Sequence, residues 1–139
     1  MIAGGSGITP MLQIVRDVFK NESENTKISL LFANQTEQDI LLRDEIENFK
    51  KEYPTRFSFM YTIDRPDENW QYQKGFINQG STKVFSITEM TYLEMIGAFI
   101  PQQGENTMTL ICGPPPMVKF ACLPNLAANG HSENRIFVY

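Results

Sequence analysis

The stretch LICGPPPMVKFACLPNL, residues 110 to 126, ends an apolar run with Cys-Gly and then places three prolines before a helical pattern. Proline fixes φ and has no N–H to donate, so this run cannot continue a strand. A proline in the first turn of a helix is tolerated, because that N–H has no helical partner. The stretch therefore predicts a rigid corner from strand to helix. In open α/β sheets, corners at the carboxyl ends of strands are where ligands bind.

A second corner lies near the start of the chain, where GGSGITP, residues 4 to 10, follows the apolar run MIA. Glycines there let the backbone approach a ligand closely, and the following helix offers free N–H groups to an anion such as pyrophosphate. The turn departs from the G-x-G-x-x-G fingerprint, because Pro10 stands where the last glycine would be. A tight turn without a ligand is the alternative for this motif taken alone.

Apolar runs and helical patterns alternate along the chain. Strands are expected at MIA, KISLLFAN, RFSFMYTID, MTLIC and RIFVY. This alternation predicts an α/β fold, an open parallel sheet of about five strands with helices on both faces, of the Rossmann-like nucleotide-binding type. The polar and aromatic segment from Arg65 to Gly80 is expected to be a loop.

The expected helices begin and end at recognisable signals. The first has Thr9 as its cap and Pro10 in its first turn, and the last is interrupted at Pro124 and ends at Gly130. The four helical segments are TPMLQIVRDVFK, TEQDILLRDEIENFKKEY (residues 36–53), TEMTYLEMIGAFI (residues 88–100) and MVKFACLPNLAANG (residues 117–130).

Length and composition narrow the classes of function. At 139 residues the chain is one domain with room for a core. Its net charge of −4 and lack of a Lys/Arg cluster give no footprint for nucleic acid or for an anionic membrane. No apolar run approaches the roughly 18 residues of a membrane span. The opening residues also lack the pattern of a signal peptide.

The cysteines and the histidine give no catalytic or metal-binding pattern. Cys112 and Cys122 have neither zinc nor redox spacing, so reduced thiols and no metal site are expected. His131 is the only histidine and lies in the turn-like NGHSEN, so it is expected at the surface. A Ser-His-Asp triad would have to be built around that one position.

The motifs FANQTEQDILLR and CGPPPM follow one another along the chain. They resemble the nicotinamide-binding half of the ferredoxin reductase superfamily, and most closely its NADH–cytochrome b5 reductases. The resemblance covers nearly the whole chain, and FANQTEQDILLR and CGPPPM are its most specific parts. It implies that residues 1–139 form an NAD(H)-binding domain. The other motifs that carry it are AGGSGITPML, YTIDRP, ACLPNL and the final FVY.

The resemblance implies roles at the nicotinamide end of the site. Cys112 and Ser6 are the candidate catalytic positions: the thiol helps to place the nicotinamide ring, and Ser6 stands where close relatives usually have Thr. The alternative for Cys112 is a strand-end thiol that only packs. The turn that faces flavin and nicotinamide and the supporting positions are Gly4, Gly5, Ser6, Gly7, Thr9, Pro10, Gly113, Pro114, Pro115 and Met117.

The resemblance also implies an adenosine end. Asp64 matches the determinant for NADH over NADPH, since a carboxylate accepts from a ribose 2′-hydroxyl but repels a 2′-phosphate. Arg65 could instead attract that phosphate, but relatives with the same Asp-Arg pair favour NADH. The alternative for Asp64 is a turn-initiating aspartate. Asn34 and Gln35 are expected to line the adenosine side, and Phe76 to contact the adenine.

For the whole protein, the resemblance implies a flavoenzyme in which NADH delivers hydride to FAD and single electrons pass to cytochrome b5. The chain contains no stretch suited to the antiparallel FAD-binding barrel, and it begins inside its first strand. We therefore expect a fragment whose partner is the FAD-binding domain of the same polypeptide, and which alone binds NADH weakly and turns nothing over.

The expected location is the cytoplasmic side of the endoplasmic reticulum or mitochondrial outer membrane, reached through an N-terminal segment beyond this chain; no direct membrane contact is expected from these residues. Two alternatives stay open. The chain could be the reductase module of another superfamily member, such as a nitrate reductase. It could also be a non-catalytic nucleotide-binding module.

Overall fold

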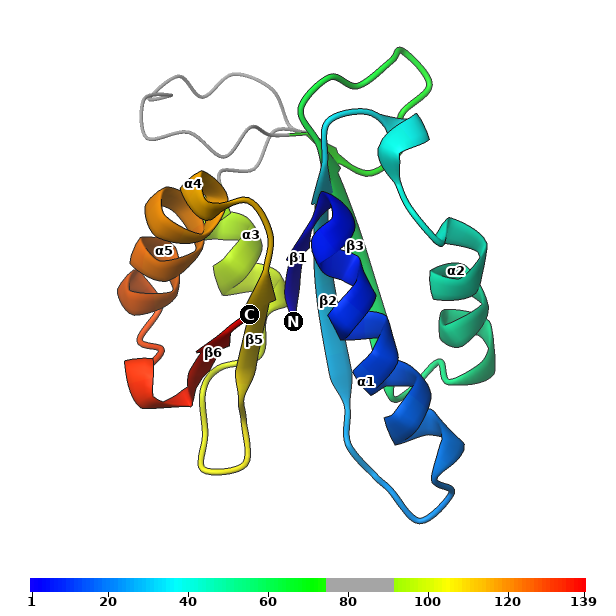
Figure 1. The fold of residues 1–139 in the computed structure, drawn as a ribbon, viewed down its shortest axis with the longest axis vertical. Coiled ribbons are helices and arrows are strands. Elements are labelled where there is room, and N and C mark those ends of the chain that lie inside the picture. The colour runs from blue at the N-terminus through cyan, green and yellow to red at the C-terminus, as the bar shows by residue number, and fades with distance from the viewer. Residues whose placement is uncertain (75–91) are drawn as a thin grey trace.

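The computed structural model describes residues 1–74 and 92–139, and within these ranges the strands form one sheet with helices on both faces (Figure 1). Every pair of neighbouring strands is parallel. The order across the sheet is β4-β3-β2-β1-β5-β6. The strands are β1 (Ile2–Gly4), β2 (Ile28–Asn34), β3 (Phe57–Ile63), β4 (Gln73–Lys74), β5 (Thr109–Cys112) and β6 (Ile136–Val138). The predicted α/β class is confirmed.

Two apolar layers hold the helices against the sheet. On one face, α1 and α2 cover a core that includes Phe19, Phe32, Ile46 and Tyr61. On the other face, α3 to α5 cover a second core that includes Leu31 and Ile111. Figure 1 shows these two groups of helices on opposite sides of the strands. The helices are α1 (Ile8–Lys20), α2 (Arg43–Glu52), α3 (Tyr92–Phe99), α4 (Pro115–Met117) and α5 (Leu123–Ala128).

The sheet has one strand more than the sequence predicts. β4 comprises two residues, Gln73 and Lys74, which pair with Thr62 and Ile63 of β3. It lies inside the segment that was expected to be a loop, because two residues are too short to show the period-two pattern of a strand. The helix expected at residues 88–100 is present as α3, although the start of that range lies outside the described residues.

The expectation of one helix over residues 36–53 is wrong. Asp39 Oδ2 accepts from the Thr36 N–H (2.9 Å) and from its hydroxyl (2.7 Å), which closes a single 3-10 turn, Glu37–Asp39. Leu42 then has a φ of 55°, in the left-handed region, and α2 begins only at Arg43. A left-handed residue cannot continue a right-handed helix, so the segment divides at this point.

The predicted interruption of the last helix is confirmed. A π-helical turn, Val118–Cys122, separates α4 from α5 and ends just before Pro124. A proline inside a helix removes one backbone hydrogen bond, and a π turn is one way to absorb that loss. The predicted end is also confirmed, since Gly130 follows α5 with a φ of 81°.

The expectation that His131 lies at the surface is wrong. Its side chain is buried, and its Nδ1 lies 3.4 Å from the hydroxyl of Thr109, the first residue of β5. The backbone N–H of His131 donates to the backbone carbonyl of Leu126 in α5 (2.9 Å). The histidine therefore packs at the end of the sheet opposite the two corners.

Among the residues that the structure describes, no helix combines the length and the apolar character that a bilayer crossing requires.

Candidate functional site

The two corners predicted from the sequence pack directly against each other, because β1 and β5 are neighbours in the sheet. A Cβ placed on Gly7 would lie 2.1 Å from the carbonyl oxygen of Cys112. A Cβ on Gly4 would lie 2.5 Å from the sulfur of Met117, and one on Gly113 would lie 2.6 Å from its terminal methyl carbon. At Gly7 the obstacle is backbone, so only a glycine lets the corners meet there, whereas at Gly4 and Gly113 the nearest atoms belong to the end of the flexible Met117 side chain.

Gly5 is a glycine for a different reason. Its φ is +52°, which favours glycine, and no heavy atom of the described residues lies within 4 Å of the place that a Cβ would occupy. The turn Gly5–Gly7 therefore presents bare backbone to an open side at the carboxyl edge of the sheet. Backbone of this kind can approach a bound molecule closely.

The helix α1 starts immediately after this turn. Its N-cap is Gly7, which has no side chain to cap it, so the expectation that Thr9 caps the helix is wrong. Thr9 lies inside the first turn, where its hydroxyl donates to the carbonyl of Ser6 (3.0 Å). Ser6 and Thr9 are both exposed. The N-terminus of a thirteen-residue helix with no acidic residue in its first turn suits a negatively charged ligand.

Cys112 ends β5 beside the glycine turn. Its thiol is free and half-buried, and it packs against the core on the α1 side of the sheet. Cys122 also forms no disulfide bond, but it is fully buried. The two thiols thus differ in access: only Cys112 is partly open to a molecule at the carboxyl edge.

The ends of β2 and β3 form the second part of this edge. The backbone N–H of Asp64 donates to the backbone carbonyl of Asn34 (3.2 Å). The backbone N–H of Arg65 likewise donates to the backbone carbonyl of Gln35 (2.9 Å). Asp64 is half-buried, and burial raises the pKa of its carboxyl group, although the charge of Arg65 acts in the opposite direction. Gln35 and Arg65 are exposed. The edge therefore holds a partly desolvated carboxyl group beside exposed polar side chains.

The side chain of Asn34 is the least expected feature of this edge. It is 6% exposed, yet neither its amide nitrogen nor its amide oxygen has a hydrogen-bond partner among residues 1–74 and 92–139. Most buried polar groups in proteins have at least one partner.

An apolar surface adjoins Cys112 on the α1 side of the sheet. Leu110 and Cys112 are its half-buried part, and Phe137 lies opposite Leu110 in the register of β5 and β6. Phe137 and Tyr139 are each 54% exposed, and their rings are 5.1 Å apart at 78°. We call these four residues the β5–β6 apolar face. Contiguous exposed apolar surface commonly marks an interaction site.

Comparison with known proteins agrees with this arrangement. Residues 1–123 match the family model described as the oxidoreductase NAD-binding domain. The chain belongs to this family. It is 48% identical to NADH-cytochrome b5 reductase 3 of Rattus norvegicus and 44% identical to NADH-cytochrome b5 reductase 1 of Homo sapiens. Both alignments cover all of this NAD-binding domain, but only 42% of the rat protein and 41% of the human protein.

Solved structures give the same result. The cytochrome b5 reductase domain of Ulva prolifera nitrate reductase superimposes with a TM-score of 0.87 at 41% identity, covering 100% of this chain and 48% of that one. The CS-b5R domains of human Ncb5or, in the NAD⁺ form, superimpose with a TM-score of 0.76 at 23% identity, covering 99% of this chain and 35% of that one. The second likeness concerns the fold alone. The predicted resemblance is confirmed, and this NAD-binding domain spans less than half the length of these proteins.

The remaining predicted residues of this NAD-binding domain differ in accessibility. Pro10 is half-buried in the first turn of α1, and Pro114 and Pro115 are exposed at the second corner. Met117 is buried beneath the glycines that it contacts, so its surroundings are those of a supporting residue. Phe76 lies outside the described residues.

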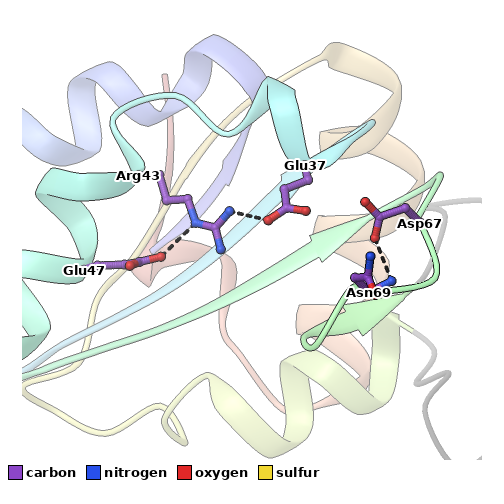
Figure 2. Close-up of polar contacts among 5 residues, drawn as sticks. All are labelled: Glu37, Arg43, Glu47, Asp67 and Asn69. Carbon is purple, nitrogen blue, oxygen red and sulfur yellow. Dashed lines mark hydrogen bonds and ion pairs between the residues drawn. The ribbon is translucent and has the colours of Figure 1, made fainter.

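The sequence did not point to Arg43, which links the 3-10 turn to α2. Figure 2 shows its guanidinium group between Glu37 of the 3-10 turn and Glu47 of α2, with Nε 2.8 Å from Glu47 Oε1. Both carboxylates raise the pKa of Arg43. Asp67, on the loop after β3, accepts from the N–H of Asn69 (3.0 Å) at the same edge (Figure 2). The i,i+4 spacing of Arg43 and Glu47 was the one available signal.

Proposed function

We propose that this chain is the NADH-binding domain of a flavin-dependent NADH–cytochrome b5 reductase. The observation that carries the proposal is the packing of the glycine turn against the Cys-Gly-Pro corner, which leaves bare backbone and a half-buried thiol at one open edge. The identity of 42–48% to proteins named NADH-cytochrome b5 reductase supports it.

The residues at this edge fit a nicotinamide dinucleotide. Gly5 leaves space for close approach of a ligand, and the uncapped start of α1 suits a pyrophosphate. When bound, NADH supplies a hydride, which FAD accepts before electrons pass singly to cytochrome b5. The protein contributes by holding the nucleotide in one orientation.

At the nicotinamide end, Cys112 and Ser6 are the positioning groups of this proposal. The half-buried thiol of Cys112 provides a surface against which the nicotinamide ring packs, and the backbone of Gly4–Gly7 limits its position from the neighbouring strand. Ser6 places an exposed hydroxyl at the same turn. Because a ligand held in one geometry reacts faster, these groups act through orientation.

At the adenosine end, Asp64 selects NADH over NADPH. Its carboxylate accepts from the 2′-hydroxyl of the ribose, whereas a 2′-phosphate in the same place meets like charge in a partly desolvated setting. Gln35, exposed beside it, belongs to the same surface.

The FAD-binding domain of the same polypeptide is the partner that we assign to the β5–β6 apolar face. This face continues from Cys112, so a flavin domain seated there would bring its cofactor to the thiol side of the nicotinamide site. In this proposal the reductase works at the cytoplasmic side of the endoplasmic reticulum or mitochondrial outer membrane, attached through residues beyond this chain.

Calorimetric titration of the chain with NADH and NADPH tests the proposal. We expect weak binding of NADH, weaker binding of NADPH, and loss of this preference in Asp64→Ala. Glu68→Ala is the matched control, because it removes an exposed carboxylate from the same loop. NADPH binding equal to that of NADH, or equal effects of the two substitutions, would contradict the role of Asp64. Absence of any nucleotide binding at millimolar concentration would contradict the proposed domain function.

A second candidate is the reductase module of a nitrate reductase. The observation that favours it is the TM-score of 0.87 with the Ulva prolifera domain. Assays of the longer polypeptide from the same gene separate the two candidates. Reduction of nitrate requires further redox domains, whereas reduction of cytochrome b5 does not.

A further inference from the structure

The buried side-chain amide of Asn34 has no hydrogen-bond partner within the part of the chain that the structure describes. Its backbone is engaged, since its carbonyl accepts from the N–H of Asp64. Neither the side-chain nitrogen nor the side-chain oxygen is paired with any of the residues described, although the side chain is almost completely buried. Leaving both atoms of an amide unpaired is costly, and an explanation is needed for each such group.

The position of Asn34 suggests which molecule supplies the partner. Ala33 pairs with Gly4 in the register of β1 and β2, so Asn34 lies one residue further along, beside the Gly5–Gly7 turn. Strand residues alternate between faces, and Phe32 belongs to the core on the α1 side, so the amide of Asn34 lies on the side where α1 begins. The amide is thus placed between the glycine turn and Asp64.

The hydrogen-bonding groups of an amide restrict the chemical class of the ligand. Asn presents N–H donors and a carbonyl acceptor side by side, so its partner must offer an acceptor and a donor close together. A phosphoryl oxygen only accepts, and a ribose hydroxyl donates. A ribose bearing a 5′-phosphate carries both, and an anion at this point also gains from the start of α1.

We propose that Asn34 binds the ribosyl phosphate of the adenosine half of the dinucleotide. Its Nδ2 donates to a phosphoryl oxygen, and its Oδ1 accepts from a hydroxyl of the adjoining ribose. This inference rests on the proposed nucleotide-binding function. It adds a residue that contacts both the phosphate and the sugar, whereas Asp64 contacts only the sugar.

Stability without nucleotide separates this role from a structural one. If the amide is unpaired until a ligand binds, Asn34→Leu removes an unpaired buried polar group. The melting temperature of this variant should then equal or exceed that of the wild-type chain. If a water molecule inside the fold satisfies the amide, the same substitution lowers the melting temperature. Tyr61→Phe is the matched control. The Tyr61 hydroxyl is also buried with no partner in the described part of the chain, but Tyr61 lies two residues before the end of β3.

Titration with ADP-ribose and with adenosine, followed by backbone amide shifts, tests the contact itself. Loss of a hydrogen bond to a charged group should weaken ADP-ribose binding about 10- to 100-fold in Asn34→Leu. Asn34→Asp should weaken it more, because the added carboxylate repels phosphate, while adenosine binding by Asn34→Asp stays near the wild-type value. Tyr61→Phe should bind both ligands as the wild-type chain does.

The possible failures are distinguishable. Wild-type affinity for ADP-ribose in Asn34→Leu, or an equal loss in Tyr61→Phe, would overturn the role of Asn34 and leave the proposed function intact. Equal weakening of adenosine and ADP-ribose by Asn34→Asp would overturn the phosphate contact. A wild-type chain that binds no ADP-ribose would overturn the proposed function and this inference with it.

Discussion

Replacing Gly7 with alanine would force a methyl group into the backbone of the neighbouring corner. The new carbon would lie 2.1 Å from the carbonyl oxygen of Cys112 and 2.5 Å from its carbonyl carbon. Because the obstacle is backbone, no side-chain rotation relieves it, and the two corners must separate by about 1 Å to regain ordinary contact. Overpacking costs about 1–3 kcal/mol, and we expect the upper end here. For a domain of this size, that lowers the melting temperature by about 10 °C.

Two other glycines provide controls for the same thermal unfolding assay. Gly5→Ala meets no neighbouring atom but keeps a φ of +52°, so we expect a loss of about 1 kcal/mol from backbone strain alone. Gly104→Ala places its methyl group 3.7 Å from the Thr107 hydroxyl oxygen, an ordinary contact, and should change stability by less than about 0.5 kcal/mol. A Gly7→Ala protein that melts with the wild type, or no earlier than Gly104→Ala, would refute the reasoning from corner packing.

Two further predictions concern charged groups. Burial lowers the pKa of the His131 imidazole below 6.5, so as the pH falls the unfolded chain takes up the imidazole proton before the folded chain does. The free energy of unfolding therefore falls as the pH drops below about 6.5. In urea unfolding, His131→Gln should flatten this dependence below about pH 6.5, and an unchanged slope would assign the dependence to other groups. Arg43→Gln should cost about 1 kcal/mol, because Glu37 and Glu47 both lose their partner. Arg16→Gln should cost less than Arg43→Gln, since Arg16 is more exposed than Arg43, and the reverse ranking in the same assay would contradict this comparison.

The parts of the fold that the sequence predicts are those determined by local chemistry. Glycines before α1 and prolines after Cys112 restrict the backbone within a few residues, so both corners were predictable. Their meeting at one edge followed from the rule that parallel strands share a carboxyl edge. Pro124 and Gly130 likewise act on their immediate neighbours, and the interruption and end of the last helix were predicted at these residues.

The parts that the sequence does not predict depend on distant contacts or on competition between local preferences. The segment from Thr36 to Tyr53 has helical spacing, but the Asp39 side chain closes a short turn first and Leu42 adopts a left-handed conformation. His131 lies in a sequence typical of a turn, and its burial against Thr109 arises only when β5 and α5 pack together. The unpaired amide of Asn34 is likewise visible only in the folded chain.

The pairing of β1 with β5 has a consequence for the cooperativity of the sheet. Seven residue pairs join β2 to β3, whereas only two join β1 to β5, at Ile2 with Ile111 and Ala3 with Cys112. This short pairing joins one half of the sheet, β4-β3-β2-β1, to the other half, β5-β6, and both corners lie at its carboxyl end. A ligand bound across them would fasten one half to the other, so its binding free energy would also resist separation of the halves. A nucleotide would therefore stabilise the sheet at a junction held by only two residue pairs, as few as join β3 to β4 at its edge.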